Sequence, residues 1–227
     1  MDAARAGVQA WLFDLDGTLI DSMPLHHEAW RAWHAQLGLD FDEAGFFEAT
    51  AGRTNDEILA DAFPTRDAGE RAQMAELKES LYRRLAAERL QLIRGARELL
   101  VGARAAGIRL AICTASPPAN LQVAFDRFAL GALVDTVTSP ADGLRGKPHP
   151  DIFIEAARRL QVPAGRCLVF EDAPLGIEAA RRAGMRAFAL TTTLPASAFA
   201  GFPHLIGTAD DLADRSVDHL LRETAHA

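Results

Sequence analysis

Two carboxylates, a glycine and a hydroxyl directly follow the first apolar run of this 227-residue chain. Residues 8–13 have the composition of a strand buried in a parallel sheet, and Asp14-Leu15-Asp16-Gly17-Thr18 comes next. Because residues two apart in an extended chain point the same way, Asp14 and Asp16 are predicted to face one pocket. Carboxylates held this close repel each other, and Mg²⁺ together with a phosphate would relieve the repulsion.

This motif alone has a second interpretation, because Asp and Gly are also common in turns. Three later segments carry polar residues at predicted strand ends and favour the chemical interpretation. In the first, residues 113–118 read Cys-Thr-Ala-Ser-Pro-Pro, where the Thr114 hydroxyl and the amides that open a helix could cradle an anion. Ser116 could also be a simple helix N-cap, and the two roles are compatible.

The other two segments supply a cation and more carboxylates. Lys147 stands between Gly146 and Pro148, which suits a fixed charge facing a phosphoryl oxygen or a carboxylate, although most lysines are simply solvated. Glu171 and Asp172 follow another apolar run and, with Asp14, could give oxygen ligands to an octahedral Mg²⁺. Asp172 could instead cap the next helix, but this would leave Glu171 unexplained.

The pattern of elements predicts that these segments meet at one edge of a sheet. From residue 96 onward, helix-like segments alternate with predicted strands at 108–113, 133–137, 166–170, 185–190 and 204–207, and a last helix is predicted at 209–221. Such alternation predicts an α/β fold, a doubly wound parallel sheet covered by helices on both faces. Residues 22–94 contain only helix-like segments and are predicted to form an inserted helical cap, so that the core comprises 1–21 and 95–227.

Composition restricts the partners and the compartment. The net charge is −7 and no long basic run occurs, which argues against nucleic acid or a membrane surface as a partner. Cys113 and Cys167 lie in strand-like runs, where buried inert thiols are expected rather than a disulfide framework. No apolar run approaches the roughly 20 residues that span a bilayer, and the chain begins without a secretory pattern. A cytoplasmic compartment and a monomer or weak homodimer are expected.

The strand-end motifs together resemble those of the haloacid dehalogenase superfamily, in the subfamily of phosphatases with a small helical cap after the first strand. The resemblance covers nearly the whole chain and rests on motifs that occur in the order of that family. They are Asp14-Leu-Asp-Gly-Thr, Thr114, Lys147 in Gly-Lys-Pro-His-Pro-Asp, and Glu171-Asp172 in Glu-Asp-Ala-Pro-Leu-Gly-Ile. Within the superfamily, the chain is most similar to sugar-phosphate phosphatases and to β-phosphoglucomutase.

The resemblance implies a covalent mechanism in which Asp14 is the nucleophile and Asp16 the general acid and base. It also implies a Mg²⁺ ion held by Asp14, Asp172 and the backbone carbonyl of Asp16, with Glu171 acting through a water molecule. Lys147 and Thr114 are implied as further catalytic residues. The groups implied to hold phosphoryl oxygens are Thr114, the Ala115 amide, Gly17 and Lys147, and Thr18 and Ser116 are predicted as further substrate-binding residues.

Three residues of the predicted cap are similar in position to substrate-binding residues of β-phosphoglucomutase. They are His26, Arg53 and Lys78. Each has a simpler interpretation as a solvated helix residue, and the adjacent His27 makes the match of His26 ambiguous.

The predicted function is therefore a Mg²⁺-dependent phosphatase that hydrolyses small phosphorylated sugars or sugar alcohols through an aspartyl-phosphate. The alternative is β-phosphoglucomutase, which transfers a phosphoryl group between C1 and C6 of glucose phosphates. Thr18 stands where that mutase has a smaller or apolar residue, and this favours hydrolysis. A non-catalytic ligand-binding relative is disfavoured by the complete set of acidic and basic groups.

Overall fold

The computed structural model describes residues 7–50 and 53–225, and the chain divides into two units. The larger unit comprises Met1–Asp21 together with Gln91–Ala227, and the smaller unit comprises Ser22–Leu90. The second junction lies four residues before the predicted one, because the segment after Leu90 is bonded to the larger unit. Ile93 N–H donates to the Leu19 carbonyl at 3.0 Å, and Leu92 forms a β-bridge with Ile20.

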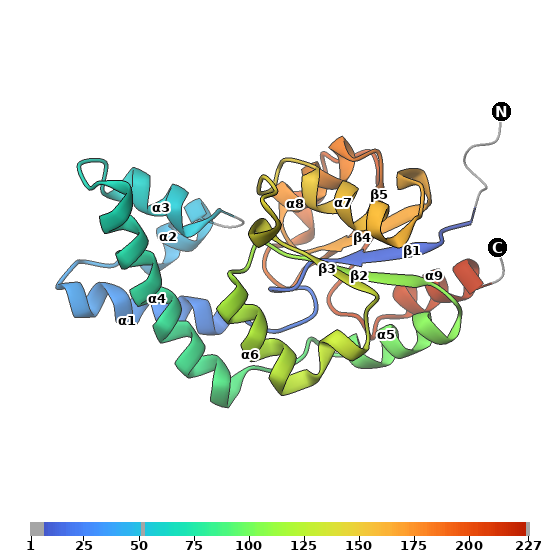
Figure 1. Cartoon of the computed structure of the whole chain (residues 1–227), viewed down its shortest axis with the longest axis horizontal. Helices are drawn as coiled ribbons and strands as arrows, with labels where there is room; N and C mark the ends of the chain where they lie inside the picture. Colours follow the sequence, from blue (N-terminus) through green and yellow to red (C-terminus); the bar gives the residue numbers. More distant parts are fainter. Residues whose placement is uncertain (1–6, 51–52, 226–227) are drawn as a thin grey trace. The chain divides into compact units, whose positions relative to one another are not determined.

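The larger unit is built on a six-stranded parallel sheet with the order β3-β2-β1-β4-β5-β6 (Figure 1). The strands are β1 (Ala10–Phe13), β2 (Arg109–Cys113), β3 (Thr136–Thr138), β4 (Cys167–Glu171), β5 (Arg186–Leu190) and β6 (Leu205–Ala209). This order confirms the predicted doubly wound sheet. The winding reverses beside β1, and in such sheets the ligand crevice lies at the carboxyl ends of the strands on either side of the reversal.

Helices cover both faces of this sheet. They are α5 (Ala96–Ala105), α6 (Pro118–Phe128), α7 (Asp151–Leu160), α8 (Pro174–Arg182) and α9 (Arg215–Ala225). Short 3₁₀ turns are η2 (Leu130–Ala132), η3 (Pro140–Asp142), η4 (Ala164–Arg166) and η5 (Ala196–Phe199). In Figure 1, α7 and α8 lie on one face of the sheet, while α5 and α9 lie on the other.

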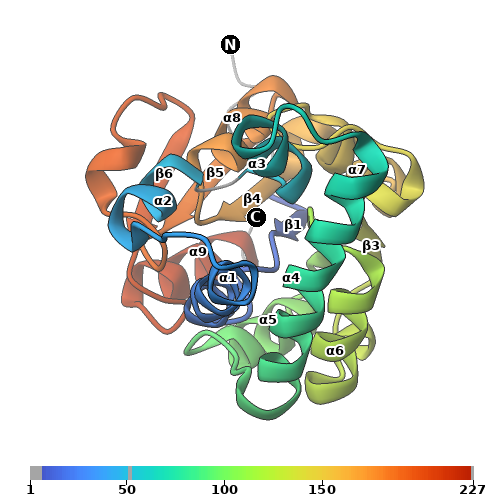
Figure 2. The same ribbon diagram turned by 90° about the vertical axis from the view of Figure 1, so that its left-hand side faces the viewer.

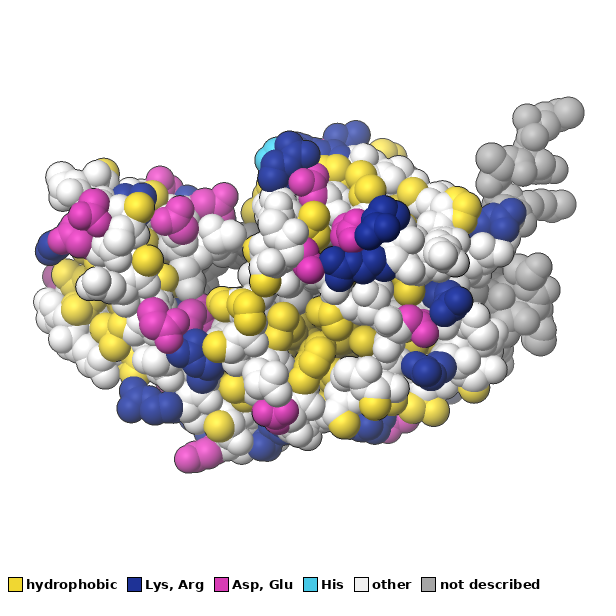
Figure 3. Space-filling model, in the orientation of Figure 1, with side chains coloured by type: hydrophobic (Ala, Val, Ile, Leu, Met, Phe, Trp, Pro, Cys, Tyr) yellow, Lys and Arg dark blue, Asp and Glu magenta, His cyan; other side chains and the backbone are white. Residues whose placement is uncertain are grey.

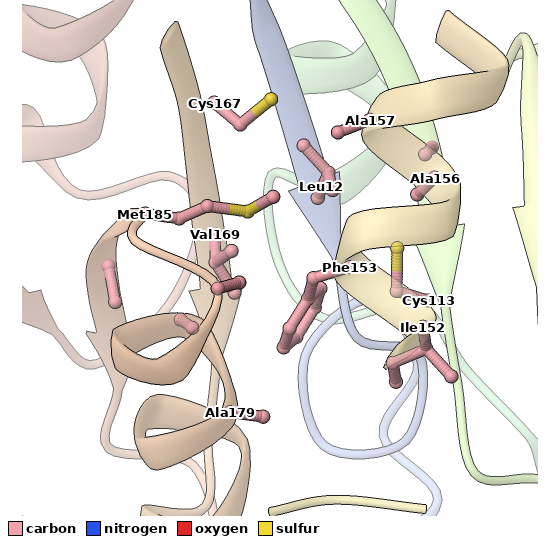
Figure 4. Close-up of a cluster of buried hydrophobic side chains, with 14 of the residues drawn as sticks. Leu12, Cys113, Ile152, Phe153, Ala156, Ala157, Cys167, Val169, Ala179 and Met185 are labelled. Atoms are coloured by element: carbon pink, nitrogen blue, oxygen red, sulfur yellow. The ribbon is translucent and has the colours of Figure 1, made fainter. Parts of the chain in front are cut away.

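Alternation along the strands divides the core between the two faces. Leu12 and Val169 point toward α7 and α8, where they join Phe153 in a buried cluster (Figure 4). On the opposite face Phe13 stacks on Phe170, with their ring centroids 4.7 Å apart. The predicted buried thiols of Cys113 and Cys167 belong to the first cluster, and burial raises the pKa of each to about 12, which keeps both protonated.

The smaller unit consists of helices over the part of it that the structure describes. They are α1 (Met23–Leu37), α2 (Glu43–Thr50), α3 (Asn55–Ala62) and α4 (Ala68–Arg89). The long helix α4 packs against α1 and α3 (Figure 1 and Figure 2). Trp33 on α1 is buried and donates its ring N–H to the Met74 carbonyl of α4 at 2.9 Å. Capping boxes at Thr54 and Asp67 fix the starts of α3 and α4.

Two elements begin three or more residues later than predicted. The third strand begins at Thr136 rather than at residue 133, because Leu133 closes a turn on the Leu130 carbonyl. The last helix begins at Arg215 rather than at residue 209, because the Asp214 carboxylate accepts the amide and hydroxyl of Ser216 and caps the helix there.

Charges of both signs are interspersed over the face of the larger unit in Figure 3. Ion pairs of the larger unit include those of Glu155 with Arg158 and Arg159. No helix among the described residues combines the length and the apolar composition that crossing a membrane requires.

Candidate active site

A buried lysine joins the ends of the two central strands. Asp14 directly follows β1, and its amide donates to the Phe170 carbonyl of β4 at 3.0 Å. The Lys147 ammonium contacts the Asp14 Oδ1 and the Glu171 Oε1 atoms. The side chains of Lys147, Asp14 and Glu171 are only 8%, 9% and 1% exposed, so these charges meet largely away from water. Lys147 precedes a cis peptide bond to Pro148, in a segment far from both carboxylates in the sequence.

The loop after β2 contacts the second aspartate of the first motif. The Ser116 hydroxyl donates to the Asp16 carboxylate, while the Ser116 amide donates to the Thr114 hydroxyl at 2.9 Å. Helix α6 begins at Pro118 with Pro117 as its N-cap, so Ser116 does not have the alternative N-cap role. Thr114 is completely buried, whereas the neighbouring Ala115 is an exposed residue.

Glu171 and Asp172, the adjacent carboxylates at the end of β4, have different hydrogen-bond partners. Glu171 accepts the amides of Asp172 and Ala173, both at 2.9 Å, with the oxygen that does not face Lys147. Ala173 is the N-cap of α8, so the interpretation of Asp172 as a helix cap does not hold. Gly176 has to lack a side chain, because a Cβ atom there would overlap the Glu171 carboxylate.

Asp172 is held by two hydroxyl groups. Its Oδ1 accepts from the Thr18 hydroxyl at 3.3 Å and its Oδ2 accepts from the Thr193 hydroxyl. Thr18 is completely buried and its hydroxyl supports this carboxylate, while its role as a substrate contact stays a prediction. Gly17 has a φ of +76°, its amide donates to the Ile20 carbonyl at 2.9 Å, and a Cβ atom there would overlap Asp172.

Burial and mutual repulsion shift the ionisation of these carboxylates. Desolvation raises the pKa of Asp14 well above its ordinary value, Lys147 opposes this, and Glu171 and Asp172 add to it. Desolvation and the Glu171 charge raise the pKa of Asp172 to about 7. Burial alone would lower the pKa of Lys147, but Asp14 and Glu171 outweigh it and raise that pKa above its usual value. One ammonium is thus insufficient for the carboxylates gathered here, and a further cation would stabilise their charged forms.

The smaller unit contains a separate buried cluster of polar groups. The Lys78 ammonium donates to the Glu79 carboxylate at 2.9 Å and to the His26 Nδ1 atom at 2.7 Å. Because an ammonium has only donors, His26 Nδ1 must be an acceptor, and the ring stacks on Tyr82 with centroids 3.8 Å apart. Asn55 donates to the same Glu79 at 2.5 Å. The structure therefore brings together His26 and Lys78, and it is His26 rather than His27 that contacts the lysine.

The Arg53 side chain contacts α3, the helix that follows it in the sequence. Its guanidinium donates to the Glu57 carbonyl at 3.1 Å and to the Asp61 carboxylate at 2.5 Å. Ala51 and Gly52, which precede Arg53 in the resemblance, lie outside the described residues.

Comparison with known proteins assigns the family. The model of the haloacid dehalogenase-like hydrolases matches residues 8–184. The chain belongs to this family. It is 34% identical over 192 residues to validoxylamine A 7'-phosphate phosphatase of Streptomyces hygroscopicus subsp. limoneus, covering 83% of this chain and 88% of the relative. It is 30% identical over 181 residues to a phosphorylated carbohydrates phosphatase of Thermotoga maritima, covering 78% and 82%.

A solved structure extends the similarity to the whole fold. The haloacid dehalogenase hydrolase, family IA, variant 3, of Entamoeba histolytica aligns with a TM-score of 0.85 at 26% identity, covering 95% of this chain and 99% of that one. The prediction of an enzyme of the phosphoric monoester hydrolase class is confirmed at the level of the family, because its relatives are named as phosphatases.

The donor set of this hydrolase fits a hard cation. Among the described residues, no three His, Cys, Asp or Glu side chains gather as a ready-made metal site. The predicted set does not require one, since it uses two carboxylates and a backbone carbonyl, and Mg²⁺ retains several waters in protein sites. A cation held there would offset the burial and mutual repulsion that raise the pKa values of Asp14 and Asp172.

Sequence reasoning missed some of the residues that hold the site together. Thr192 donates to the Gly17 carbonyl at 2.5 Å and Thr193 to Asp172, both from the loop after β5. A signal for them existed, because three threonines follow a predicted strand whose carboxyl end lies at the same edge of the sheet. Glu79 and Asn55 carried no such signal, since a polar residue on a long helix is usually solvated.

Proposed function

We propose that this hydrolase is a Mg²⁺-dependent phosphatase of small phosphorylated sugars or sugar alcohols that works through an aspartyl-phosphate. The observation that carries the proposal is the contact of Lys147 with both Asp14 and Glu171 at the reversal point of the sheet. The preference for sugar phosphates is supported by the relative that is named a phosphorylated carbohydrates phosphatase.

In the first proposed step, an Asp14 oxygen attacks the phosphorus atom and the bond from phosphorus to the sugar oxygen breaks. Asp16 gives its proton to the departing sugar oxygen, so an alcohol leaves and Asp16 becomes a carboxylate. In the second step this carboxylate takes a proton from a water molecule that attacks phosphorus. The bond between phosphorus and Asp14 then breaks, which releases phosphate and restores the Asp14 carboxylate.

The surrounding residues have supporting roles in this proposal. Lys147 neutralises charge on Asp14 and on the transferring phosphoryl oxygens, and the amide of the exposed residue Ala115 donates to one of those oxygens. Ser116 holds Asp16 through its hydroxyl. When bound by Asp14, Asp172 and the Asp16 carbonyl, Mg²⁺ would supply electrostatic stabilisation of the phosphoryl oxygens.

The helical unit is proposed to act as the cap that selects the substrate. The groups on the larger unit act on the phosphoryl group, which every phosphate ester shares, so the choice among sugars has to come from other residues. His26, Arg53 and Lys78 are the proposed contacts, and closure of a cap over a substrate would exclude water from the reaction.

A screen of phosphate release tests this proposal. The protein is incubated with sugar phosphates, hexitol phosphates and p-nitrophenyl phosphate, each with Mg²⁺ and each with EDTA. We expect rapid release from at least one sugar or hexitol phosphate with Mg²⁺, and loss of release with EDTA. Activity that is unchanged by EDTA, or the absence of release from every ester, would overturn the proposal.

A second assay separates hydrolysis from the mutase reaction. The protein is incubated with β-glucose 1-phosphate and a trace of glucose 1,6-bisphosphate, and glucose 6-phosphate is measured against free phosphate. We expect free phosphate to be the main product. Glucose 6-phosphate that forms much faster would establish the mutase, while the proposed roles of Asp14 and Asp16 would remain the same.

A further inference from the structure

Three consecutive threonines, residues 191–193, follow β5, and each of them donates to a different part of the larger unit. Thr191 donates to the Asp210 carboxylate at 2.6 Å, beside the end of β6. Thr192 donates to the Gly17 carbonyl at 2.5 Å, and Thr193 donates to the Asp172 carboxylate. Because β5 pairs with β4, the carboxyl end of β5 lies beside the proposed site, and the loop reaches it from the side away from β1.

The Asp172 carboxylate accepts one hydrogen bond from this loop and another from the segment that follows β1. Thr18 donates to Oδ1 and Thr193 to Oδ2, and the residue is only 4% exposed. At Gly17 the chain passes so close that a Cβ atom there would overlap Asp172 Oδ2 and would lie 2.8 Å from the Thr193 hydroxyl oxygen. An ionised carboxylate offers about four lone-pair positions, so two hydroxyl donors fix its plane and still leave positions for a cation.

We propose that Thr193 is a positioning residue that holds Asp172 in the orientation in which the carboxylate binds Mg²⁺. Thr193 thereby sets the Mg²⁺ affinity of the enzyme without contacting substrate. This inference rests on the proposed function, since it takes Asp172 as a ligand. Groups that orient metal ligands typically change metal affinity by about 10- to 100-fold when they are removed.

The test measures Mg²⁺ binding to the enzyme in the absence of substrate. Thr193→Val keeps the shape of the side chain and removes the donor, and we expect the Kd for Mg²⁺ in calorimetric titration to rise about tenfold or more. The rise in Tm that Mg²⁺ causes is a second measurement, and it should shrink at a fixed Mg²⁺ concentration. Thr193→Ser retains the hydroxyl and should restore the wild-type Kd to within about threefold.

The matched control is Thr191→Val. It removes a hydroxyl of the same loop that donates to Asp210, and it leaves the hydrogen bond from Thr193 to Asp172 in place. Its Kd for Mg²⁺ should equal that of the wild type. An unchanged Kd in folded Thr193→Val, or an equal rise in both valine variants, would overturn the inference. If Thr193→Val does not fold, Thr193→Ala is measured in its place and read by the same criterion.

Asp172→Asn separates failure of this inference from failure of the proposed function. If Asp172→Asn binds Mg²⁺ as tightly as the wild type, then Asp172 is no ligand, and both the metal site and the role of Thr193 are wrong. If Asp172→Asn loses Mg²⁺ binding while Thr193→Val retains it, only the role of Thr193 is wrong.

Discussion

Each of the two units buries one lysine against carboxylates, and the two clusters differ in their balance of charge. In the larger unit, Lys147 contacts Asp14 and Glu171, with Asp172 close enough to raise the pKa of Asp14. In the helical unit, the Lys78 side chain is 3% exposed and contacts the Glu79 carboxylate, which also accepts a hydrogen bond from Asn55.

This difference separates a site with an excess of carboxylates from one in which a lysine and a carboxylate are paired. Buried charges are tolerated when each is paired with an opposite charge. Where carboxylates outnumber cations, their mutual repulsion raises the pKa values of the carboxylates, and a bound cation lowers these values again. Lys78 and Glu79 form a pair of opposite charges, and His26 adds a neutral acceptor to it. The carboxylates around Lys147 exceed it in number, which is why the larger unit and not the helical unit is expected to take up a cation.

The largest effect should come from removing the charge that makes the larger unit's cluster reactive. Asp14→Asn keeps the shape of the side chain, but an amide neither attacks phosphorus nor gives an anionic ligand. We expect phosphate release to fall by about a thousandfold or more, measured as kcat on the best sugar phosphate. Residual turnover within tenfold of the wild type would contradict the role of Asp14 as nucleophile and favour a binding protein.

Lys147→Ala should lower kcat nearly as much as Asp14→Asn, because it removes a charge that stabilises the reacting groups rather than the nucleophile. Removing a group that stabilises developing charge typically costs about 10²- to 10³-fold in kcat, and this loss should persist at saturating Mg²⁺. Asp172→Ala is the comparison, because the loss of a metal ligand should appear mainly as a higher Mg²⁺ requirement. Mg²⁺ titrations of phosphate release check both, and equal Mg²⁺ dependence of Asp172→Ala and the wild type would contradict the distinction.

Much of the larger unit could be predicted because its signals are local. Buried parallel strands appear as short apolar runs, and polar residues directly after them mark the ligand edge, as at Asp14, Thr114 and Asp172. The junction at Leu90 could not be predicted, since backbone hydrogen bonds such as that from Ile93 to Leu19 leave no pattern of side chains.

The helical unit was less predictable for the same physical reason. Its polar cluster joins Lys78 to His26 across 52 residues, and which face of α4 is buried depends on how α1 and α3 pack. Lys78 and Glu79 are adjacent on a helix whose other charged residues are mostly exposed, so composition alone assigns both to solvent.

Removing Glu79 from its ion pair with Lys78 should lower the free energy of unfolding more than it lowers the rate of phosphate release. Glu79→Ala leaves the Lys78 ammonium buried beside a histidine and without the Glu79 carboxylate, and removing one partner of a buried ion pair typically costs about 3–5 kcal/mol. We expect a lower urea midpoint by Trp fluorescence, to which Trp30 and Trp33 of the helical unit contribute. The control is Glu76→Ala on the same helix, where the ion pair with Arg83 is 67% exposed on the glutamate side and should matter little. Similar shifts in both variants would contradict the comparison.

The smallest effect should come from Arg53, because its present ion pair is a weak one. Its partner Asp61 is 72% exposed, and pairs at such positions contribute about 0–1 kcal/mol. The guanidinium can therefore exchange Asp61 for a substrate at little cost. Arg53→Ala should lower kcat/KM on the best sugar phosphate about tenfold, and it should lower kcat/KM on p-nitrophenyl phosphate, which has no polyol, much less.

Asp61→Asn is the control that separates recognition of substrate from support of the helix. It removes the ion pair but keeps the guanidinium, so kcat/KM on the sugar phosphate should stay at the wild-type level or rise. If both variants lose activity equally, the pair supports α3 and Arg53 does not recognise the sugar. If Arg53→Ala loses the same factor on both substrates, the guanidinium acts on the phosphate, and the division between a larger unit that does the chemistry and a helical unit that selects the sugar is wrong at this residue.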